Sequence, residues 1–233
     1  MIAVINITEN FQTKRAKRVV SVFNCIKSRG ENVKIISSNF DHGEKKRLTS
    51  KDPRELLVPV FKYRSHFSIF RLINHFWFSI CVFFILISTK KLRGVYVSSI
   101  PPELLFAVCL IKIFRPSVKV TVDIRDVWPD SLPNASDNWL SKIFKYHSEI
   151  LYRFSFKRCD ERIIVNPDFE NYIHRYNCSA KLVTLGYDKM RFAHSMGTAR
   201  DGCVYIGNFN HSFDLRVMSK FINQNYSCRL IGD

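Results

Sequence analysis

The chain has 233 residues, of which 46% are hydrophobic and 24% are charged. This apolar content is enough to form a buried core, which excludes an intrinsically disordered or low-complexity chain. The 36 Lys and Arg outnumber the 20 Asp and Glu, and the formal charge of +16 favours an anionic partner: nucleic acid, an anionic membrane surface or a phosphorylated substrate. Seven Cys without a C-x-x-C pair exclude a small disulfide scaffold and, with no signal-peptide features at the start, predict a reducing, cytoplasmic setting.

Strand-like and helix-like segments alternate along the first 190 residues. Short runs rich in Val, Ile and Leu predict strands, and longer runs with apolar residues three and four apart predict helices. The predicted strands are 2–7, 33–36, 56–61, 94–98, 118–124, 162–165 and 181–185. The predicted helices are 14–27, 67–87, 102–114, 139–154 and 168–176. This alternation predicts a doubly wound α/β domain, with a mostly parallel sheet covered by helices on both faces.

Three of these segments carry more specific predictions. Residues 41–54 are polar and charged, which predicts a loop. Pro59 predicts that the strand 56–61 is either an edge strand or an irregular one. The helix 139–154 is expected to bury one apolar face. That face consists of Trp139, Leu140, Ile143, Phe144, Ile150, Leu151 and Phe154.

The longest apolar run, from Phe76 to Ile87, is interrupted only by Ser79. It is shorter than the roughly 20 apolar residues that cross a bilayer, so we do not expect a membrane span. A helix with apolar residues on nearly all sides is either buried in the protein or partly seated in the interface of a bilayer. Burial is the commoner case, and we expect most of this helix to be buried.

The composition changes near residue 190. Residues 195–202 are polar, which predicts a linker over 191–202. Beyond it, strands at 203–206 and 228–231 flank a helix at 214–222, in a β-α-β unit of about 35 residues that is too small to sustain a core of its own. We therefore assign residues 1–190 to the first domain and residues 203–233 to an incomplete second α/β domain.

The segment 123–131, with the sequence Asp-Ile-Arg-Asp-Val-Trp-Pro-Asp-Ser, is the most informative in the chain. It leaves the carboxyl end of the strand 118–124, where open α/β sheets place their ligand sites. An alternative without a ligand remains open. In that case the segment is a loop in which carboxylates pair with Arg125 and Trp128 belongs to the core.

The segment 123–131 closely resembles the D-[IV]-R-D-[LV]-W-P-x-S signature of glycosyltransferase family 4 enzymes that build bacterial surface polysaccharides. Shorter segments at 98–102, 185–188, 204–208 and 230–233 resemble turns of that family in the same order. The resemblance implies a GT-B fold of two facing Rossmann-like domains, with the acceptor bound mainly by the first and a nucleotide sugar mainly by the second. It further implies sugar transfer, with retention, from a nucleoside-diphosphate sugar to a lipid-linked acceptor in lipopolysaccharide, O-antigen or capsule synthesis.

The resemblance also identifies candidate residues of the first domain. Asp126 and Arg125 are the catalytic candidates, because a carboxylate can hydrogen-bond the acceptor hydroxyl or accept its proton and a guanidinium suits phosphate oxygens. Asp123, Trp128 and Ser99 would lie at the acceptor cleft, with Asp123 bridging the strand end and the loop. The family requires no cofactor and no structural metal, and no zinc-ligand spacing is visible.

In the second domain, Gly207 and Asn208 lie where the family turns backbone N–H groups toward the donor diphosphate. The family's E-x7-E motif would lie beyond Asp233. The resemblance therefore predicts that the chain is an N-terminal fragment of such an enzyme, with little or no transferase activity alone. The alternative is a catalytically inactive truncated remnant or a membrane-associated binding module.

Basic residues crowd the start of the helix 14–27: Lys14, Arg15, Lys17 and Arg18. A solvated helix face is the ordinary interpretation of such a cluster. Each basic residue near an anionic membrane also contributes about 1 kcal/mol of attraction, and the pattern suits a lipid-diphosphate acceptor. We predict peripheral attachment to the inner face of the cytoplasmic membrane through these residues.

Nucleic-acid binding is the rival interpretation, and it rests on charge alone. The sequence contains no helix-turn-helix, zinc-finger or RNP-type pattern. Its 20 Phe gather in apolar runs and do not alternate with basic residues. We therefore do not expect a nucleic-acid partner.

Overall fold

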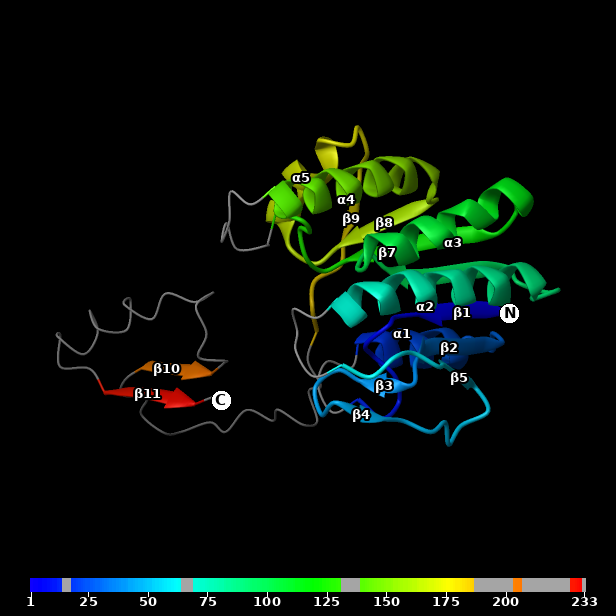
Figure 1. The fold of residues 1–233 in the computed structure, drawn as a ribbon, viewed down its shortest axis with the longest axis horizontal. Helices are drawn as coiled ribbons and strands as arrows, with labels where there is room; N and C mark the ends of the chain where they lie inside the picture. The colour runs from blue at the N-terminus through cyan, green and yellow to red at the C-terminus, as the bar shows by residue number, and fades with distance from the viewer. Residues whose placement is uncertain (14–17, 64–68, 131–138, 187–202, 207–226, 232–233) are drawn as a thin grey trace. The chain divides into compact units, whose positions relative to one another are not determined.

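The computed structural model describes residues 1–13, 18–63, 69–130, 139–186, 203–206 and 227–231 (Figure 1). The chain divides into two compact units, Met1–Leu185 and Gly186–Asp233. In the second unit the described elements are strands β10 (Cys203–Ile206) and β11 (Cys228–Ile231), which pair in parallel. The expected linker and the expected helix 214–222 lie outside the described residues.

A parallel sheet of seven strands, in the order β5-β2-β1-β6-β7-β8-β9, organises the first unit. Its strands are β1 (Ile2–Ile5), β2 (Val33–Ser38), β5 (Glu55–Val58), β6 (Gly94–Ser98), β7 (Lys119–Ile124), β8 (Glu161–Ile164) and β9 (Lys181–Leu182). The chain adds strands outward from β1 in one direction and then returns to add β6 on its other side. This reversal is the topological switch point of a doubly wound sheet, so the predicted Rossmann-like α/β fold is confirmed.

Helices connect the strands. They are α1 (Arg18–Ser28), α2 (Ile69–Ser88), α3 (Pro102–Phe114), α4 (Trp139–Arg158) and α5 (Glu170–His174), the last preceded by a 3-10 turn at Pro167–Phe169. Helices α2, α3 and α4 lie side by side over one face of the sheet (Figure 1). Of the described helices, α1 alone packs on the opposite face, where it covers β1 and β2, so the expected helical cover is uneven between the two faces.

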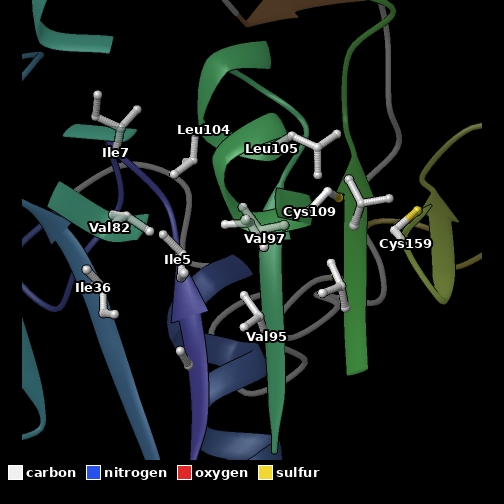
Figure 2. Close-up of a cluster of buried hydrophobic side chains, with 14 of the residues drawn as sticks. Ile5, Ile7, Ile36, Val82, Val95, Val97, Leu104, Leu105, Cys109 and Cys159 are labelled. Atoms are coloured by element: carbon white, nitrogen blue, oxygen red, sulfur yellow. The ribbon is translucent and has the colours of Figure 1, made fainter. Parts of the chain in front are cut away.

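The main core forms between the sheet and the three neighbouring helices (Figure 2). Ile5 of β1 and Val97 of β6 meet Val82 of α2 and Leu104 and Leu105 of α3, and all five side chains are fully buried. Alternate strand residues point to the other face, where β1 and β2 meet α1 in a smaller apolar cluster.

Two predictions about the segment after β2 have different outcomes. The segment 41–54, predicted to be a loop, contains part of a short antiparallel pair, β3 (Phe40–Asp41) with β4 (Lys46–Arg47). Strand β5 ends directly before Pro59 and lies at the edge of the sheet, as the proline predicted.

Helix α2 is much less buried than we expected. Its fully buried side chains are Asn74, Phe78, Val82 and Leu86, which recur every fourth residue and form one narrow stripe. Phe76, Trp77, Ile80 and Phe84, by contrast, are each between 45% and 61% exposed. The prediction of burial was wrong because one stripe is enough to attach the helix to the sheet and α3.

The same helix contains a stretch, Phe70–Ser88, with a mean hydropathy of 1.9. Its length and apolar composition are sufficient to cross a membrane. Core helices of soluble proteins can have the same length and composition.

Helix α4 buries only part of the face that the sequence predicted: Phe154 packs against the core, but the centre of the buried side lies elsewhere on the helix. Its buried residues include Ser148, Tyr152 and Phe156, whereas Trp139 and Ile150 are at least half exposed. The Tyr152 and Phe156 rings stack with centroids 5.1 Å apart, and the Tyr152 hydroxyl donates to a backbone carbonyl after β6. The core side of α4 is thus lined by serine and aromatic side chains, whereas apolar periodicity had placed the buried side around the aliphatic residues.

Phe156→Ala should lower the free energy of unfolding by about 3–5 kcal/mol, because it removes a fully buried ring from the core. Ile150→Ala, the matched control on the exposed side, should change it by less than about 0.5 kcal/mol. Urea unfolding followed by circular dichroism measures both. Equal losses for the two variants would contradict the assigned face.

His42, directly after β3, is held neutral by its surroundings. Burial lowers its pKa from 6.5 to about 4, despite the opposing effect of the Ile7 carbonyl 3.2 Å from Nε2. Its Nδ1 contacts the Tyr63 hydroxyl, and Ser38 Oγ lies 3.3 Å from Nε2. The folded protein therefore binds a proton at His42 more weakly than the unfolded chain does.

Because the folded-state pKa is the lower one, the stability contributed by neutral His42 is present above pH 6.5 and is lost as the pH falls toward 4. Between pH 7 and pH 4.5 this loss amounts to about 2–3 kcal/mol. His42→Gln, which retains hydrogen-bonding groups, should lose that much less stability over the same interval. Urea unfolding at the two pH values measures the difference, and identical losses in both proteins would refute the assignment.

Candidate functional site

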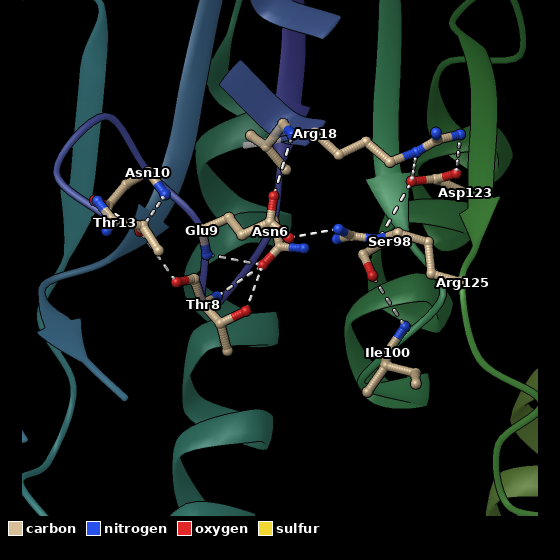
Figure 3. A network of polar contacts seen from close by, with 11 residues as sticks. Asn6, Thr8, Glu9, Asn10, Thr13, Arg18, Ser98, Ile100, Asp123 and Arg125 are labelled. Carbon is tan, nitrogen blue, oxygen red and sulfur yellow. Dashed lines mark hydrogen bonds and ion pairs between the residues drawn. The ribbon is translucent and has the colours of Figure 1, made fainter. Parts of the chain in front are cut away.

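The candidate site lies at the carboxyl edge of the central strands (Figure 3). The loops after β1, β6 and β7 meet there, and each carries polar side chains directly after its strand ends. The segment 123–131 begins within β7 and continues into the loop at this edge. This is the edge at which open α/β sheets bind ligands, on both sides of the switch point.

Asp123 is the centre of the polar network at this edge. The side chain is 1% exposed and accepts two hydrogen bonds from Arg18, from Nε at 2.9 Å and from Nη2 at 3.0 Å. Arg125 Nε lies 3.3 Å from the same carboxylate, and the Asp123 carbonyl accepts from the Ser99 backbone N–H at 3.0 Å. Asp123 thus connects α1, the end of β6 and the loop after β7, as its expected bridging role requires.

Arg18 does not occupy the position we predicted for it. Only 14% of its side chain is exposed, and its guanidinium is bound to Asp123. Burial lowers its pKa, but the hydrogen bond and charge of Asp123 outweigh that effect and raise it. The prediction that Arg18 contacts a membrane was therefore wrong, since its charge is used inside the protein. Lys14, Arg15 and Lys17 lie outside the described residues.

Glu9 is a site residue that the sequence analysis missed. It is 6% exposed, and one of its carboxylate oxygens contacts Arg125 while the other accepts from the Val19 backbone N–H at 3.1 Å. The Glu9 backbone N–H donates to the side chain of Asn6 at 3.0 Å. The signal that could have found both residues is their position directly after the central strand, beside the switch point.

Asp126 lies two residues beyond β7 at the same edge. It is half-buried, and it forms no hydrogen bond or ion pair with another residue that the structure describes. Its neighbour Arg125 is 21% exposed and is shared between Glu9 and Asp123. The structure therefore brings the two catalytic candidates to one edge, with Arg125 held between two carboxylates and Asp126 without a partner among the residues that the structure describes.

The other two expected cleft residues lie deeper. Trp128 is half-buried, its ring meets Phe144 edge-on at 5.7 Å, and its carbonyl accepts from the Tyr172 hydroxyl at 2.6 Å. Ser99 is 2% exposed, and its carbonyl accepts from the Tyr152 hydroxyl at 3.1 Å. Ser99 thus lies at the end of β6, as a cleft residue would, but its side chain is buried beneath the surface.

No group of three or more His, Cys, Asp or Glu side chains among the described residues could hold a metal ion. Gly207 and Asn208, the expected donor-binding residues, lie outside the described part of the chain.

No family model matches this chain, and no curated protein matches it significantly. Among solved structures, sucrose-phosphate synthase from Thermosynechococcus elongatus superposes with a TM-score of 0.71 and 11% identity, over 99% of this chain and 61% of that one. The fold is GT-B-like. The N-terminal domain of trehalose-6-phosphate phosphatase from Candida albicans gives a TM-score of 0.58 and 9% identity, over 89% of this chain and 56% of that one. The chain thus spans less than two thirds of either structure, and at such identities the likeness concerns the fold.

Asp123→Ala should lower the free energy of unfolding by about 3–5 kcal/mol, because it leaves the largely buried Arg18 charge without its partner. Asp130 forms a comparable pair with Arg175 at 2.6 Å, but both side chains are 47% exposed. Asp130→Ala should therefore cost no more than about 1 kcal/mol. Thermal and urea unfolding distinguish the two, and a small loss for both would show that Asp123 does not hold the edge together.

Proposed function

We propose that this chain contributes the acceptor-binding domain of a retaining, family 4-like glycosyltransferase that builds lipopolysaccharide, O-antigen or capsule. The donor would be a nucleoside-diphosphate sugar, used as a substrate with no cofactor, and the acceptor a lipid-linked saccharide. The observation that carries the proposal is the position of residues 123–130 in a GT-B-like fold, at the carboxyl end of β7, which pairs with β6 next to the switch point.

The arrangement of charges supports a role for Asp126 in the reaction. The neighbouring carboxylates, Glu9 and Asp123, are already bound to arginines, whereas Asp126 has no described partner. A half-buried carboxylate of this kind can orient an acceptor hydroxyl and accept its proton as the glycosidic bond forms. Arg125 would then act by positioning the loop, because it could bind a phosphate only by exchanging one of its carboxylate partners.

The sucrose-phosphate synthase similarity supports a glycosyltransferase in general terms, and with it a sugar donor and an acceptor. The lipid-linked acceptor and the cytoplasmic, membrane-peripheral location are further parts of the proposal. They are supported by the formal charge of +16 and by the exposed apolar side of α2.

A second candidate is a membrane-associated binding module without catalytic activity. It is favoured by the pairing of Arg18 and Arg125 with buried carboxylates, which leaves neither of these charges free for a phosphate group.

A transfer assay with labelled UDP- and GDP-sugars and membrane-extracted lipid acceptors tests the proposal. We expect transfer when the chain is joined to the donor domain of a family 4 enzyme, and little or none from the chain alone. In the joined protein, Asp126→Asn should lower kcat by about 100- to 10,000-fold, with a much smaller effect on KM. Asp130→Asn, in the same loop but paired with Arg175 at the surface, is the matched control.

Full activity of the Asp126→Asn variant would refute the role of that carboxylate. Binding of the lipid-linked acceptor without transfer in any form of the protein would favour the binding module.

A further inference from the structure

An apolar groove crosses the three-helix layer on its outer side. Phe76, Ile80, Phe83 and Phe84 of α2 line one wall, Phe106, Ala107 and Leu110 of α3 line the floor, and Leu151 of α4 contributes the opposite wall. The groove has a volume of about 370 Å³. This is within the range of sites that bind a small molecule or a single hydrocarbon chain.

The groove has one polar end. Glu103, in the first turn of α3, is 4% exposed, and one of its oxygens lies 3.3 Å from His147 Nε2. Its other oxygen is buried and has no hydrogen-bond partner among the described residues. Burial raises the pKa of Glu103, which favours the uncharged acid in an apolar setting. A ligand with a long apolar body and a single hydroxyl or ester group would match this lining.

The surface around the groove is also apolar. Large hydrophobic side chains on the three helices are between 37% and 71% exposed. They are Phe70, Leu72, Ile73, Phe76, Trp77, Ile80 and Phe84 of α2, Ile113 and Phe114 of α3, and Trp139, Ile143, Tyr146 and Ile150 of α4. Soluble proteins seldom expose this much apolar surface without a partner that covers it.

Charge indicates which partner that is. Helix α4 carries five Lys or Arg and one acid, Glu149, whose carboxylate accepts a hydrogen bond from the Tyr176 hydroxyl at 2.9 Å. The exposed basic side chains Lys142, Arg153 and Lys157 adjoin the apolar surface, and Glu149, four residues before Arg153, is the one acid on this helix to set against its five basic residues. Apolar and aromatic residues bordered by basic ones are the pattern of helices that lie in the interface of an anionic bilayer.

A membrane-spanning role for α2 fits the structure less well. Phe78, Val82 and Leu86 are fully buried against the rest of the first unit, so a spanning α2 would have to leave its core. Lying at the interface keeps these contacts and covers only the outer side of the helix.

We propose that the outer face of α2, α3 and α4 lies against the interface of an anionic lipid bilayer, and that the groove takes one hydrocarbon chain of a bilayer lipid. This inference deepens the proposed function. It rests on that function only in the choice of a lipid as the partner, because an enzyme reaches a lipid-linked acceptor from the bilayer surface. The tests below measure bilayer and chain binding without turnover, so the two proposals can fail separately.

Flotation of the full chain with vesicles of phosphatidylcholine and phosphatidylglycerol tests the face. Ile80→Glu and Phe84→Glu should each weaken vesicle binding about tenfold or more, because each places a charge where an apolar side chain enters the interface. Leu56→Glu is the matched control, since Leu56 is 42% exposed on β5 at the edge of the sheet. Circular dichroism confirms that each variant is folded.

Two further measurements address the depth of contact and the groove. Phe84→Trp should gain fluorescence that vesicles with brominated acyl chains quench, which contact through charge alone would not produce. Ala107→Leu, which narrows the groove at a side chain that is 7% exposed, should weaken binding of a dansyl-labelled undecanol by about tenfold in the absence of vesicles. Ile150→Leu, a volume-conserving change outside the groove lining, should leave that binding unchanged.

Several outcomes would overturn the proposal. Vesicle binding that is unaffected by the two Glu variants, or that is abolished by salt and shows no quenching by bromine, would assign the attachment to basic residues alone. A self-associated chain that becomes monomeric with Ile80→Glu and never binds vesicles would assign the face to a second copy. Unchanged undecanol binding by Ala107→Leu would remove the groove as a chain site.

Discussion

The carboxylate of Asp123 is the interaction on which the candidate site depends. It is almost fully buried, and an ionised group in that position is tolerated only when it is paired and hydrogen-bonded. Arg18, 105 positions away in the sequence, supplies a bidentate partner from the first turn of α1. The pair fixes α1 against β7 on the face of the sheet that no other described helix covers.

Arg125 extends that pair into a network. It lies between Asp123 and Glu9, so the loop after β7 is joined to the loop after β1. Glu9 is in turn held by the Val19 backbone N–H of α1. The two arginines and the two carboxylates of this network therefore balance in charge. Asp126, which follows directly, has no hydrogen-bond or ion-pair partner among the described residues and is the carboxylate that we propose takes part in the reaction.

The opposite face of the sheet obeys a different constraint. Helices α2, α3 and α4 are held there by apolar contacts, and α2 needs only its buried stripe at every fourth residue to stay in place. The helix is nevertheless apolar around most of its circumference. The surplus apolar surface lies on the outer side, together with the groove that ends at Glu103. The paired charges at the carboxyl edge and the surplus apolar surface of the three helices are thus the two features on which the proposals for the reaction and for lipid contact rest.

The sequence by itself determined the order of the seven sheet strands and the helices of the first unit, the parallel sheet and the position of the segment that begins at Asp123 at a strand end, because these follow from local periodicity and composition. Only the tertiary structure decided which sides of α2 and α4 are buried, since periodicity shows that a helix has an apolar side but not which neighbour covers it. The tertiary structure also decided the partners of Arg18 and revealed Glu9. Residue pairs separated by about a hundred positions produce no recognisable spacing in the sequence, because they become neighbours only when the sheet folds.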